Sequence, residues 1–454
     1  MSIRSRIFPT VIAVLAVLGL RAHGSDPLVL GVDQAVELAL SDNLGLQAQQ
    51  LAARSDERAY LNRFNVLIPT VSASATLIRP NREPEAPQIP GVPPDPGAAT
   101  PPRWNLRTGV DASLTLSLQI LDGIQASRLA FEDARLSLAV AARDIEIGVR
   151  SAFYQLLLQQ EQLQLSEARF ESGVERIADL EGQFEAGFID EFTLLTQQVG
   201  VENQRPALRR QRDAVQAALR RFADTIGIDP DTPIRLDGSI QDAFMEIDDL
   251  RGLLDRVTDA SAVEQARRQR QQLVVARQAT VSSLFPTVTL SWGVNPVLGA
   301  DPFNMSELVD RDNWTDNGAF SVTIRQPIDP FLRWSATRVR LADQADQIEQ
   351  AAISVTTTER QVRLEVLGII EQLETITSGI ESLQSNILLA ERALELANEG
   401  FEAGLRTLSA VEDAELDLRN AQFELLQEQS RFVDNILTLE NTLGFPLPEM
   451  ETSE

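Results

Sequence analysis

The sequence consists of two copies of one pattern, and this duplication constrains the fold more than any other feature. Three widely separated motifs return after the same interval of 217 residues: Leu-Ile-Pro-Thr-Val at 67–71 as Leu-Phe-Pro-Thr-Val at 284–288, Phe-Glu-Ala-Gly at 184–187 as the same tetrapeptide at 401–404, and Ile226-Gly227 as Leu443-Gly444. Three matches at one offset indicate a tandem duplication. We therefore expect the structural elements of the first copy to occur again in the second.

The N-terminus has the pattern of an export signal. Arg4 and Arg6 precede an apolar run over residues 7–20, and the small residues Ala22 and Gly24 follow it. This order of a basic start, a short apolar core and a small-residue cleavage site predicts a signal peptide over residues 1–24. No later segment approaches the run of about 18 apolar residues that a membrane-spanning helix needs, so we expect any membrane-crossing part of the exported chain to consist of strands.

The composition argues against several classes of function. The chain carries 40 basic side chains, all of them arginine, against 66 acidic ones, and its formal net charge is −26. Nucleic-acid binding needs clustered positive charge, so this balance argues against a nucleic-acid partner. Cysteine is absent, and the one histidine, His23, lies in the predicted signal. Because nucleophile, phosphate-loop and metal-spacing motifs are also missing, the sequence predicts no enzyme activity, no cofactor and no metal site.

Within each copy the periodicity of the apolar residues changes from helical to strand-like and back. Residues 71–77 and 110–120 alternate apolar with polar side chains, and residues 288–294 and 320–325 do the same in the second copy. These segments approach the length of a tilted strand that crosses a bilayer, about 10 residues. They predict four amphipathic strands, two in each copy.

Long helices follow the strands in both copies. Apolar residues at seven-residue intervals, such as Leu425, Phe432 and Leu439, predict left-handed coiled coils. Gly187 and Gly404 stand where each outgoing helix is expected to end and turn back. The helices are too polar to lie in lipid, so we expect them to lie outside the membrane.

These patterns divide the chain as follows. The first repeat is residues 25–230, with strands at about 68–79 and 106–121 and helices at about 33–66, 122–186 and 188–226. A linker over 231–250 precedes the second repeat, residues 251–446, with strands at about 285–295 and 318–328 and helices at about 250–283, 331–402 and 405–443. Residues 447–454 form a C-terminal tail.

All tryptophans of the chain lie in or beside the predicted strands, and the long helices contain none. They are Trp104, Trp292, Trp314 and Trp334. Tryptophan is enriched where a membrane protein meets the lipid headgroups, so these residues predict an aromatic girdle. Ordinary packing at strand edges is the alternative interpretation.

Four strands are too few to close a barrel, since the smallest membrane barrels have about eight. Open strand edges are not tolerated in lipid, so we expect strands of several chains to combine. Two chains would supply eight strands with an interior filled by side chains, and three would supply twelve around an open lumen. The strongly acidic composition predicts a conduit that tolerates cations.

The order and repetition of these elements resemble the TolC-like outer-membrane efflux protein family, over roughly residues 28–446. The segments that carry the resemblance are residues 32–48, the two Leu-x-Pro-Thr-Val motifs and the two Phe-Glu-Ala-Gly turns. The resemblance implies a mainly α-helical homotrimer with a helical barrel in the periplasm and a twelve-stranded β-barrel in the outer membrane. It also implies a periplasmic adaptor and an inner-membrane transporter as partners.

The resemblance also implies roles for residues near the two turns. The periplasmic tips that meet the adaptor correspond to two short segments: Gly187, Phe188 and Ile189 in the first copy, and Gly404, Leu405, Arg406 and Thr407 in the second. The family's entrance is narrowed by rings of aspartate, which fall here at Ala410 and Asp413, with Glu412 beside Asp413. Arg406 matches an arginine that holds the tip closed; its acidic partner falls at Thr193, and Asp190 and Glu191 are the nearby acids.

The sequence thus predicts a passive channel of a tripartite efflux or type I secretion system, located in the outer membrane and gated at its periplasmic tip. The alternative is a periplasmic coiled-coil adaptor or scaffold, which would explain the helices and the export signal. It would not explain the four amphipathic strands or the duplication.

Overall fold

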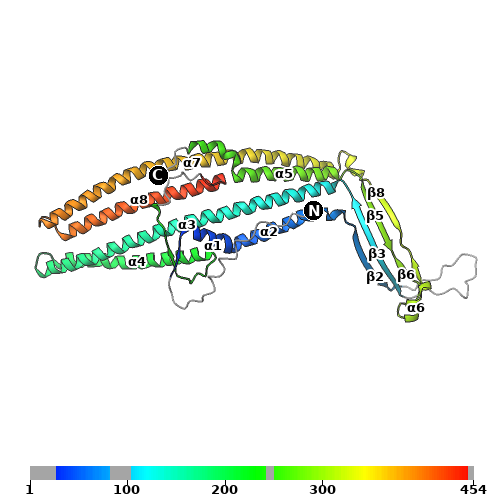
Figure 1. The fold of residues 1–454 in the computed structure, drawn as a ribbon, viewed down its shortest axis with the longest axis horizontal. Helices are drawn as coiled ribbons and strands as arrows, with labels where there is room; N and C mark the ends of the chain where they lie inside the picture. The colour runs from blue at the N-terminus through cyan, green and yellow to red at the C-terminus, as the bar shows by residue number, and fades with distance from the viewer. Residues whose placement is uncertain (1–26, 82–103, 242–249, 448–454) are drawn as a thin grey trace, which may run out of the picture. The chain divides into compact units, whose positions relative to one another are not determined.

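The computed structural model describes residues 27–81, 104–241 and 250–447 (Figure 1). The predicted signal peptide therefore lies outside the described residues, as do most of the predicted tail at 447–454 and residues 242–249 of the linker at 231–250. The α-helices are α1 (Val32–Asp42), α2 (Leu44–Leu61), α3 (Gln119–Glu185), α4 (Glu191–Thr225), α5 (Ser261–Ser282), α6 (Met305–Val309), α7 (Ala336–Glu402) and α8 (Leu408–Leu443). Short 3₁₀ helices are η1 (Arg63–Leu67), η3 (Arg251–Asp259), η4 (Arg311–Asn313) and η5 (Asp329–Phe331).

The strands are β1 (Leu28–Leu30), β2 (Thr70–Ile78), β3 (Asn105–Leu116), β4 (Ile234–Leu236), β5 (Thr287–Val294), β6 (Pro296–Leu298), β7 (Trp314–Asp316) and β8 (Phe320–Arg325). The four predicted amphipathic strands are present as β2, β3, β5 and β8, each shorter than expected. The mainly helical fold with four strands per chain is therefore confirmed. The small strands β1, β4, β6 and β7 were not expected.

The helix predicted over residues 33–66 is divided into α1 and α2. Asn43 separates them, because its side-chain oxygen accepts a hydrogen bond from the Leu46 N–H at 3.0 Å and so caps the start of the next helix. The Asn43 amide group also donates to the Thr225 carbonyl at 3.0 Å, which fixes this break against the end of α4. In the second copy the helix predicted over 250–283 likewise begins as the 3₁₀ helix η3 before α5.

The chain forms two compact units that do not coincide with the two sequence repeats. Unit 1 comprises Met1–Gln49, Leu138–Ser261 and Arg360–Glu454. Unit 2 comprises Gln50–Ser137 and Ala262–Glu359. Each unit thus combines segments of both copies. The reason is that the long helices α3 and α7 each contribute one part to each unit.

Unit 1 contains a core where α1 packs against α3 and the end of α4. Ala35 and Ala39 of α1 are fully buried with Val149 and Phe153 of α3 and Phe222 of α4. The short parallel pair of β1 and β4 covers this core, with Leu30 paired to Leu236. Because α1 presents alanine there, its backbone can approach α3 closely.

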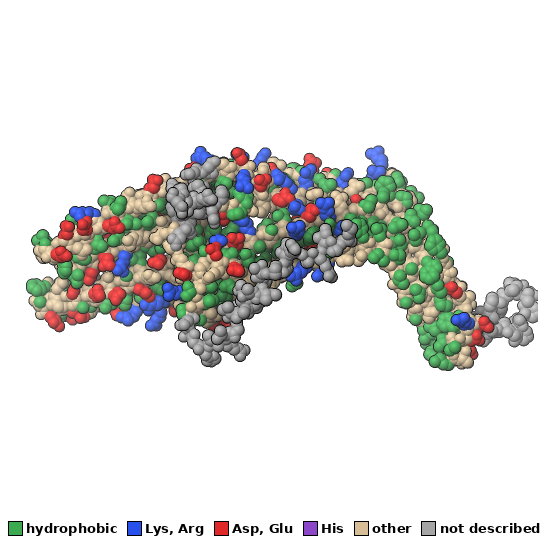
Figure 2. Space-filling view, in the orientation of Figure 1, with side chains coloured by type: hydrophobic (Ala, Val, Ile, Leu, Met, Phe, Trp, Pro, Cys, Tyr) green, Lys and Arg blue, Asp and Glu red, His purple; other side chains and the backbone are tan. Residues whose placement is uncertain are grey.

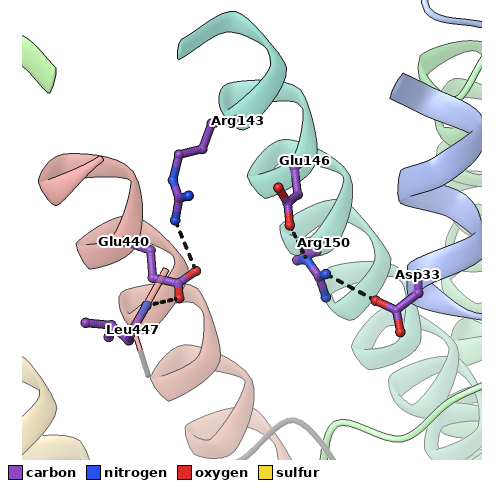
Figure 3. A network of polar contacts seen from close by, with 6 residues as sticks. All are labelled: Asp33, Arg143, Glu146, Arg150, Glu440 and Leu447. Carbon is purple, nitrogen blue, oxygen red and sulfur yellow. Dashed lines mark hydrogen bonds and ion pairs between the residues drawn. The ribbon is translucent and has the colours of Figure 1, made fainter. Parts of the chain in front are cut away.

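Ion pairs join the helices of unit 1 around this core (Figure 3). Arg150 of α3 contacts Asp33 of α1 at 3.1 Å and Glu146 at 3.3 Å. Arg143 contacts Glu440 of α8 at 3.9 Å, and the second oxygen of Glu440 accepts a hydrogen bond from the Leu447 N–H at 2.7 Å. Glu440 therefore connects α3 to the chain that leaves α8.

Unit 2 contains the sheet and the helices next to it. Arg268 of α5 contacts Glu132 of α3 at 3.6 Å, and Arg267 of α5 contacts Glu359 of α7 at 2.8 Å, so α5 lies between these two helices. Tyr60 of α2 stacks on Phe131 of α3 with ring centroids 5.2 Å apart. In the described parts of the chain, we find no helix long and apolar enough to cross a membrane.

Candidate functional site: the strand wall and the helical tips

The sheet in unit 2 is an antiparallel wall in the order β2, β3, β5, β8. β3 pairs with β2 over Thr70–Ser113 to Ile78–Asn105, and with β5 over Val110–Val294 to Leu116–Val288. β5 pairs in turn with β8 over Thr287–Arg325 to Trp292–Phe320. Because side chains alternate between the two faces of a strand, this register decides which residues share a face.

The register sorts the side chains into an apolar and a polar face. One cross-strand row contains only apolar residues: Val71, Ala112, Trp292 and Phe320. The neighbouring row contains only hydroxyl residues: Thr70, Ser113, Ser291 and Ser321. The hydroxyls of Thr70 and Ser113 lie 2.9 Å apart, and those of Ser291 and Ser321 lie 2.7 Å apart. The strands therefore form a wall with one apolar and one hydrogen-bonding side.

The apolar face of the wall is open to the surroundings. Val71 is 70% exposed, Phe320 66% and Ile324 69%. In Figure 2 the strands carry an almost continuous apolar surface, whereas acidic and basic side chains gather over the helices. An apolar patch this extensive on a folded chain marks a surface that contacts lipid or another protein.

Both outer edges of the wall lack a partner strand. In the described part of the chain β2 pairs only with β3, and β8 pairs only with β5. Each edge strand presents a row of free backbone N–H and C=O groups, which are costly to expose in lipid and readily pair with another chain. In one chain the wall therefore has two edges at which a further strand could pair.

The four tryptophans have different surroundings. Trp292 on β5 and Trp334, which follows η5, are exposed, at 50% and 79%. Trp314 donates its indole N–H to the Leu308 carbonyl at 2.9 Å. Trp104 packs edge-to-face on Phe303, with centroids 5.7 Å apart. Trp104 and Trp314 thus hold together the segment around β6, α6 and β7, a contribution that the sequence did not reveal.

The two predicted tips are the same structural motif. Gly187 and Gly404 have φ values of 77° and 70°, the left-handed conformation that a glycine adopts at the end of a helix. The next residue closes the turn in each case: Phe188 N–H donates to the Gln183 carbonyl at 2.8 Å, and Leu405 N–H donates to the Gly400 carbonyl at 2.7 Å. Their side chains are 81% and 83% exposed.

The returning helices begin with equivalent caps, also 217 residues apart. Asp190 accepts a hydrogen bond from the Thr193 N–H at 2.9 Å, and Thr407 accepts one from the Ala410 N–H at 3.3 Å. The hydrogen bonds from Thr193 hold the pKa of the Asp190 carboxyl below its ordinary value. Asp190 is thus occupied as a helix cap.

The structure does not bring the predicted latch residues together in one chain. The Arg406 side chain lies along Gly400 of its own hairpin, and among the described residues no ion pair joins Arg406 to Asp190 or Glu191. The physical reason is that Arg406 continues the turn after Gly404, where its N–H donates to the Gly400 carbonyl at 3.1 Å. Ile189 completes the first tip, and it is only partly exposed.

Asp413, the predicted gate residue, is on α8 and forms an ion pair with Arg176 of α3. One heptad away, Arg169 of α3 donates a hydrogen bond to Asn420 of α8. These contacts join the hairpin of α3 and α4 to the hairpin of α7 and α8. The sequence missed Arg176 and Arg169, although two arginines seven residues apart on an expected coiled coil are a signal for such contacts.

Glu412 is less exposed to solvent than its neighbour Asp413. One of its carboxyl oxygens is inaccessible to solvent and has no hydrogen-bond partner. Burial, followed by repulsion from Glu175 of α3, raises the pKa of Glu412, and Arg176 opposes this shift.

In the parts of the chain that the structure describes, no group of acidic or histidine side chains is arranged to hold a metal ion.

The second repeat matches a known family model. Residues 253–445 match the model described as "Outer membrane efflux protein". They are an outer membrane efflux protein domain. No protein of curated function matches the chain in sequence.

Solved structures agree with this outer membrane efflux domain over nearly the whole chain. The CmeC outer membrane channel of Campylobacter jejuni is 14% identical, with a TM-score of 0.71 over 91% of this chain and 85% of that one. The outer membrane protein VceC of Vibrio cholerae is 16% identical, with a TM-score of 0.68 over 91% and 96%. The open-state MtrE outer membrane channel of Neisseria gonorrhoeae is 16% identical, with a TM-score of 0.70 over 91% and 89%.

At these identities the likeness shows a common fold, which covers both repeats of the chain. The resemblance to TolC-like efflux proteins, predicted from the repeat and its motifs, is thereby confirmed. Together, the family model and the fold favour the channel over the adaptor or scaffold hypothesis.

Proposed function

We propose that this protein is the outer-membrane channel of a tripartite efflux or type I secretion system. Three copies would each contribute β2, β3, β5 and β8 to a twelve-stranded barrel, with the apolar row of Trp292 and Phe320 toward lipid and the hydroxyl row of Ser291 and Ser321 toward the lumen. The observation that carries this proposal is the wall with two unpaired edges and one exposed apolar face.

In this proposal the helices continue the conduit into the periplasm. The helical surface carries charged side chains, as expected for protein in water (Figure 2). The exposed Phe188 and Leu405 at the two turns would contact a periplasmic adaptor, and an inner-membrane transporter would supply the energy. Trp292 and Trp334 would lie at the lipid headgroups.

The gate would lie at the contact between the two hairpins. Three copies of the Arg176–Asp413 pair around a common axis would hold the entrance narrow, with Glu412 beside each pair. The ion pairs would hold the hairpins together, and the ring of carboxylates would attract cations.

Reconstitution into planar bilayers tests the proposal. Detergent-purified full-length protein should produce cation-preferring channel currents, because the lumen would be polar and the chain is strongly acidic. Protein that remains monomeric in detergent and produces no current would contradict the proposal.

The docking part of the proposal has its own test. Phe188→Ser and Leu405→Ser should leave the single-channel conductance unchanged but reduce the inner-membrane transporter that copurifies after cross-linking in native membranes. Undiminished copurification of the double variant would exclude these two side chains from docking.

A further inference from the structure

The hydroxyl face of the wall also carries charged side chains, which the strand register locates. Residues two positions apart on a strand share a face. Arg107 and Asp111 of β3 therefore lie on the face of Ser113. By the same rule, Arg325 of β8 lies on the face of Ser321. All three charged side chains are exposed.

The charge of this face is opposite in sign to that of the chain. The chain carries 66 acidic and 40 basic side chains, with a formal net charge of −26. In the described strands, the hydroxyl face carries two arginines, Arg107 and Arg325, and one aspartate, Asp111. The face that would line a conduit is therefore basic, although the composition of the chain predicts the opposite.

Arg325 is well separated from the acidic residue of this face. Asp111 is level with Gly293 of β5, and Arg325 is level with Thr287 of the same strand. These two positions of β5 are six residues apart, which corresponds to about 20 Å along a strand. Charges in water are largely screened beyond a Debye length of about 8 Å at physiological ionic strength. Asp111 therefore does not neutralise Arg325.

The ion pairs of unit 2 also leave Arg325 charged. In the described part of this unit they all join helical residues, such as Arg268 with Glu132, and none of them involves Arg325. The next acidic residue along the chain, Asp329, begins η5 beyond the end of the strand. Asp111 accepts a hydrogen bond from the Asn295 amide at 3.3 Å. The hydroxyl face therefore presents an unneutralised guanidinium group at the end of β8.

In a wall closed by three copies, the three Arg325 side chains would lie at one level of the lumen. Twelve strands about 4.8 Å apart and tilted by about 40° enclose a ring with a backbone radius of about 12 Å. Side chains narrow this opening further, so a solute that crosses the level of Arg325 would pass within about one Debye length of a positive charge. Fixed charges at this distance select ions by their sign.

We propose that the strand part of the conduit favours anions, with Arg325 as the residue that sets this preference and Arg107 as a second basic level of the wall. The inference rests on the oligomer of the proposed function and names the class of solute that the wall favours: molecules with carboxylate, sulfonate or phosphate groups, which a guanidinium group binds with two parallel hydrogen bonds. The cation preference expected of the whole conduit then comes from its acidic helices, and the wall opposes it.

Block of the current by citrate, a multivalent anion, tests this inference in planar bilayers at low salt. Citrate should block the full-length wild-type channel, because its carboxylates bind at the ring of Arg325. Arg325→Gln should weaken the block about tenfold and shift the reversal potential toward a stronger cation preference, since the ring then carries no charge. Arg325→Lys keeps the charge and should retain most of the block.

Two further variants serve as matched controls. Arg205→Gln removes the same charge from α4, where Arg205 pairs with Glu202 of its own helix, and it should leave the block by citrate unchanged. Arg325→Gln combined with Thr323→Arg moves the arginine by one row on the same face and should restore the block. Thr323→Arg alone adds a second basic row beside Arg325 and should strengthen it.

The outcomes separate this inference from the proposed function. Channels that conduct but show the same block in wild type and Arg325→Gln, or no block in wild type, would overturn the inference and leave the channel standing. An equal loss of block in Arg205→Gln would also overturn it, because the net charge of the chain would then be the cause. If Arg325→Gln fails to fold, an unchanged block in Thr323→Arg overturns the inference. Wild-type protein that produces no current would refute the proposed function as well.

Discussion

Asp413 of α8 pairs with Arg176 of α3, so the carboxylate expected to narrow the entrance also joins the two helical hairpins of one chain. A simple ring of free carboxylates would bind cations but would not hold the hairpins together. A carboxylate paired across the hairpins does both, because separating them breaks the ion pair. Separating the two hairpins at this point would therefore cost the ion pair between Arg176 and Asp413.

Asp413→Ala should raise the single-channel conductance and weaken block by divalent cations. The variant removes the pair to Arg176 and the carboxylate that would attract the cation. Since both side chains are at least one-third exposed, the loss of stability should be below about 1 kcal/mol. Planar bilayer recordings check the prediction, with Glu415→Ala as control, because Glu415 pairs with Arg419 of its own helix. Unaltered block by divalent cations in Asp413→Ala would remove this residue from the gate.

Glu412→Gln should stabilise the protein at neutral pH. Burial and the neighbouring Glu175 raise the pKa of Glu412 in the folded state, so the folded protein binds this proton more tightly than the unfolded chain does. The stability linked to Glu412 is therefore highest below the unfolded pKa of about 4.5 and falls as the pH rises through the folded pKa.

Thermal unfolding of wild type and Glu412→Gln at several pH values measures this effect. The advantage of the variant should be present at pH 7 and should disappear as the pH approaches 4. A variant that is less stable than wild type at pH 7 would show that the ionised carboxylate contributes favourably.

Leu290→Arg and Ser291→Arg form a matched pair on neighbouring positions of β5. Leu290 forms a second cross-strand row of the apolar face with Leu114 and Val322, so arginine there should cost about 2–4 kcal/mol in lipid and reduce the membrane-inserted fraction. Ser291 belongs to the hydroxyl row, and arginine there should permit insertion but lower the cation preference. Membrane fractionation and reversal potentials measure these effects. Normal insertion of Leu290→Arg with impaired insertion of Ser291→Arg would mean that the hydroxyl face, and not the apolar face, contacts lipid.

Gly404→Ala should destabilise the second tip by about 1–2 kcal/mol, because a residue with a Cβ atom is strained at a φ of 70°. Open space surrounds the position, so the strain comes from the backbone rather than from a clash. Gly148→Ala, in the middle of α3 and equally free of neighbours, is the control and should be stabilising. Limited proteolysis at the tip reports the difference, and equal protection of both variants would contradict it.

The sequence predicted the repetitive parts of this fold well. The alternation over residues 71–77 and the two tip glycines each follow from short-range rules, so the strands and turns could be located without a structure. The division of the first helix at Asn43 was missed, because it depends on a contact with Thr225 that is 182 residues away. The two compact units were also missed, since they combine segments of both copies.

Only part of the candidate site could be predicted from the sequence. Asp413 was named, but its partner Arg176 lies on a helix of the other repeat, and one sequence does not show which helices are neighbours. Within one chain Asp190 caps α4, and the salt bridges of the described residues do not join it to Arg406, so the latch stays a prediction. The girdle of tryptophans stays a prediction, and Trp104 and Trp314 have partners inside the chain that the sequence did not show.

The strands β2, β3, β5 and β8 of one chain leave both edges of the wall open, and we propose that two further copies complete it. Electron microscopy of the detergent-purified, full-length protein tests this most directly. We predict class averages with three-fold symmetry viewed along a central opening. Well-folded particles containing a single chain of 50.0 kDa would contradict the account.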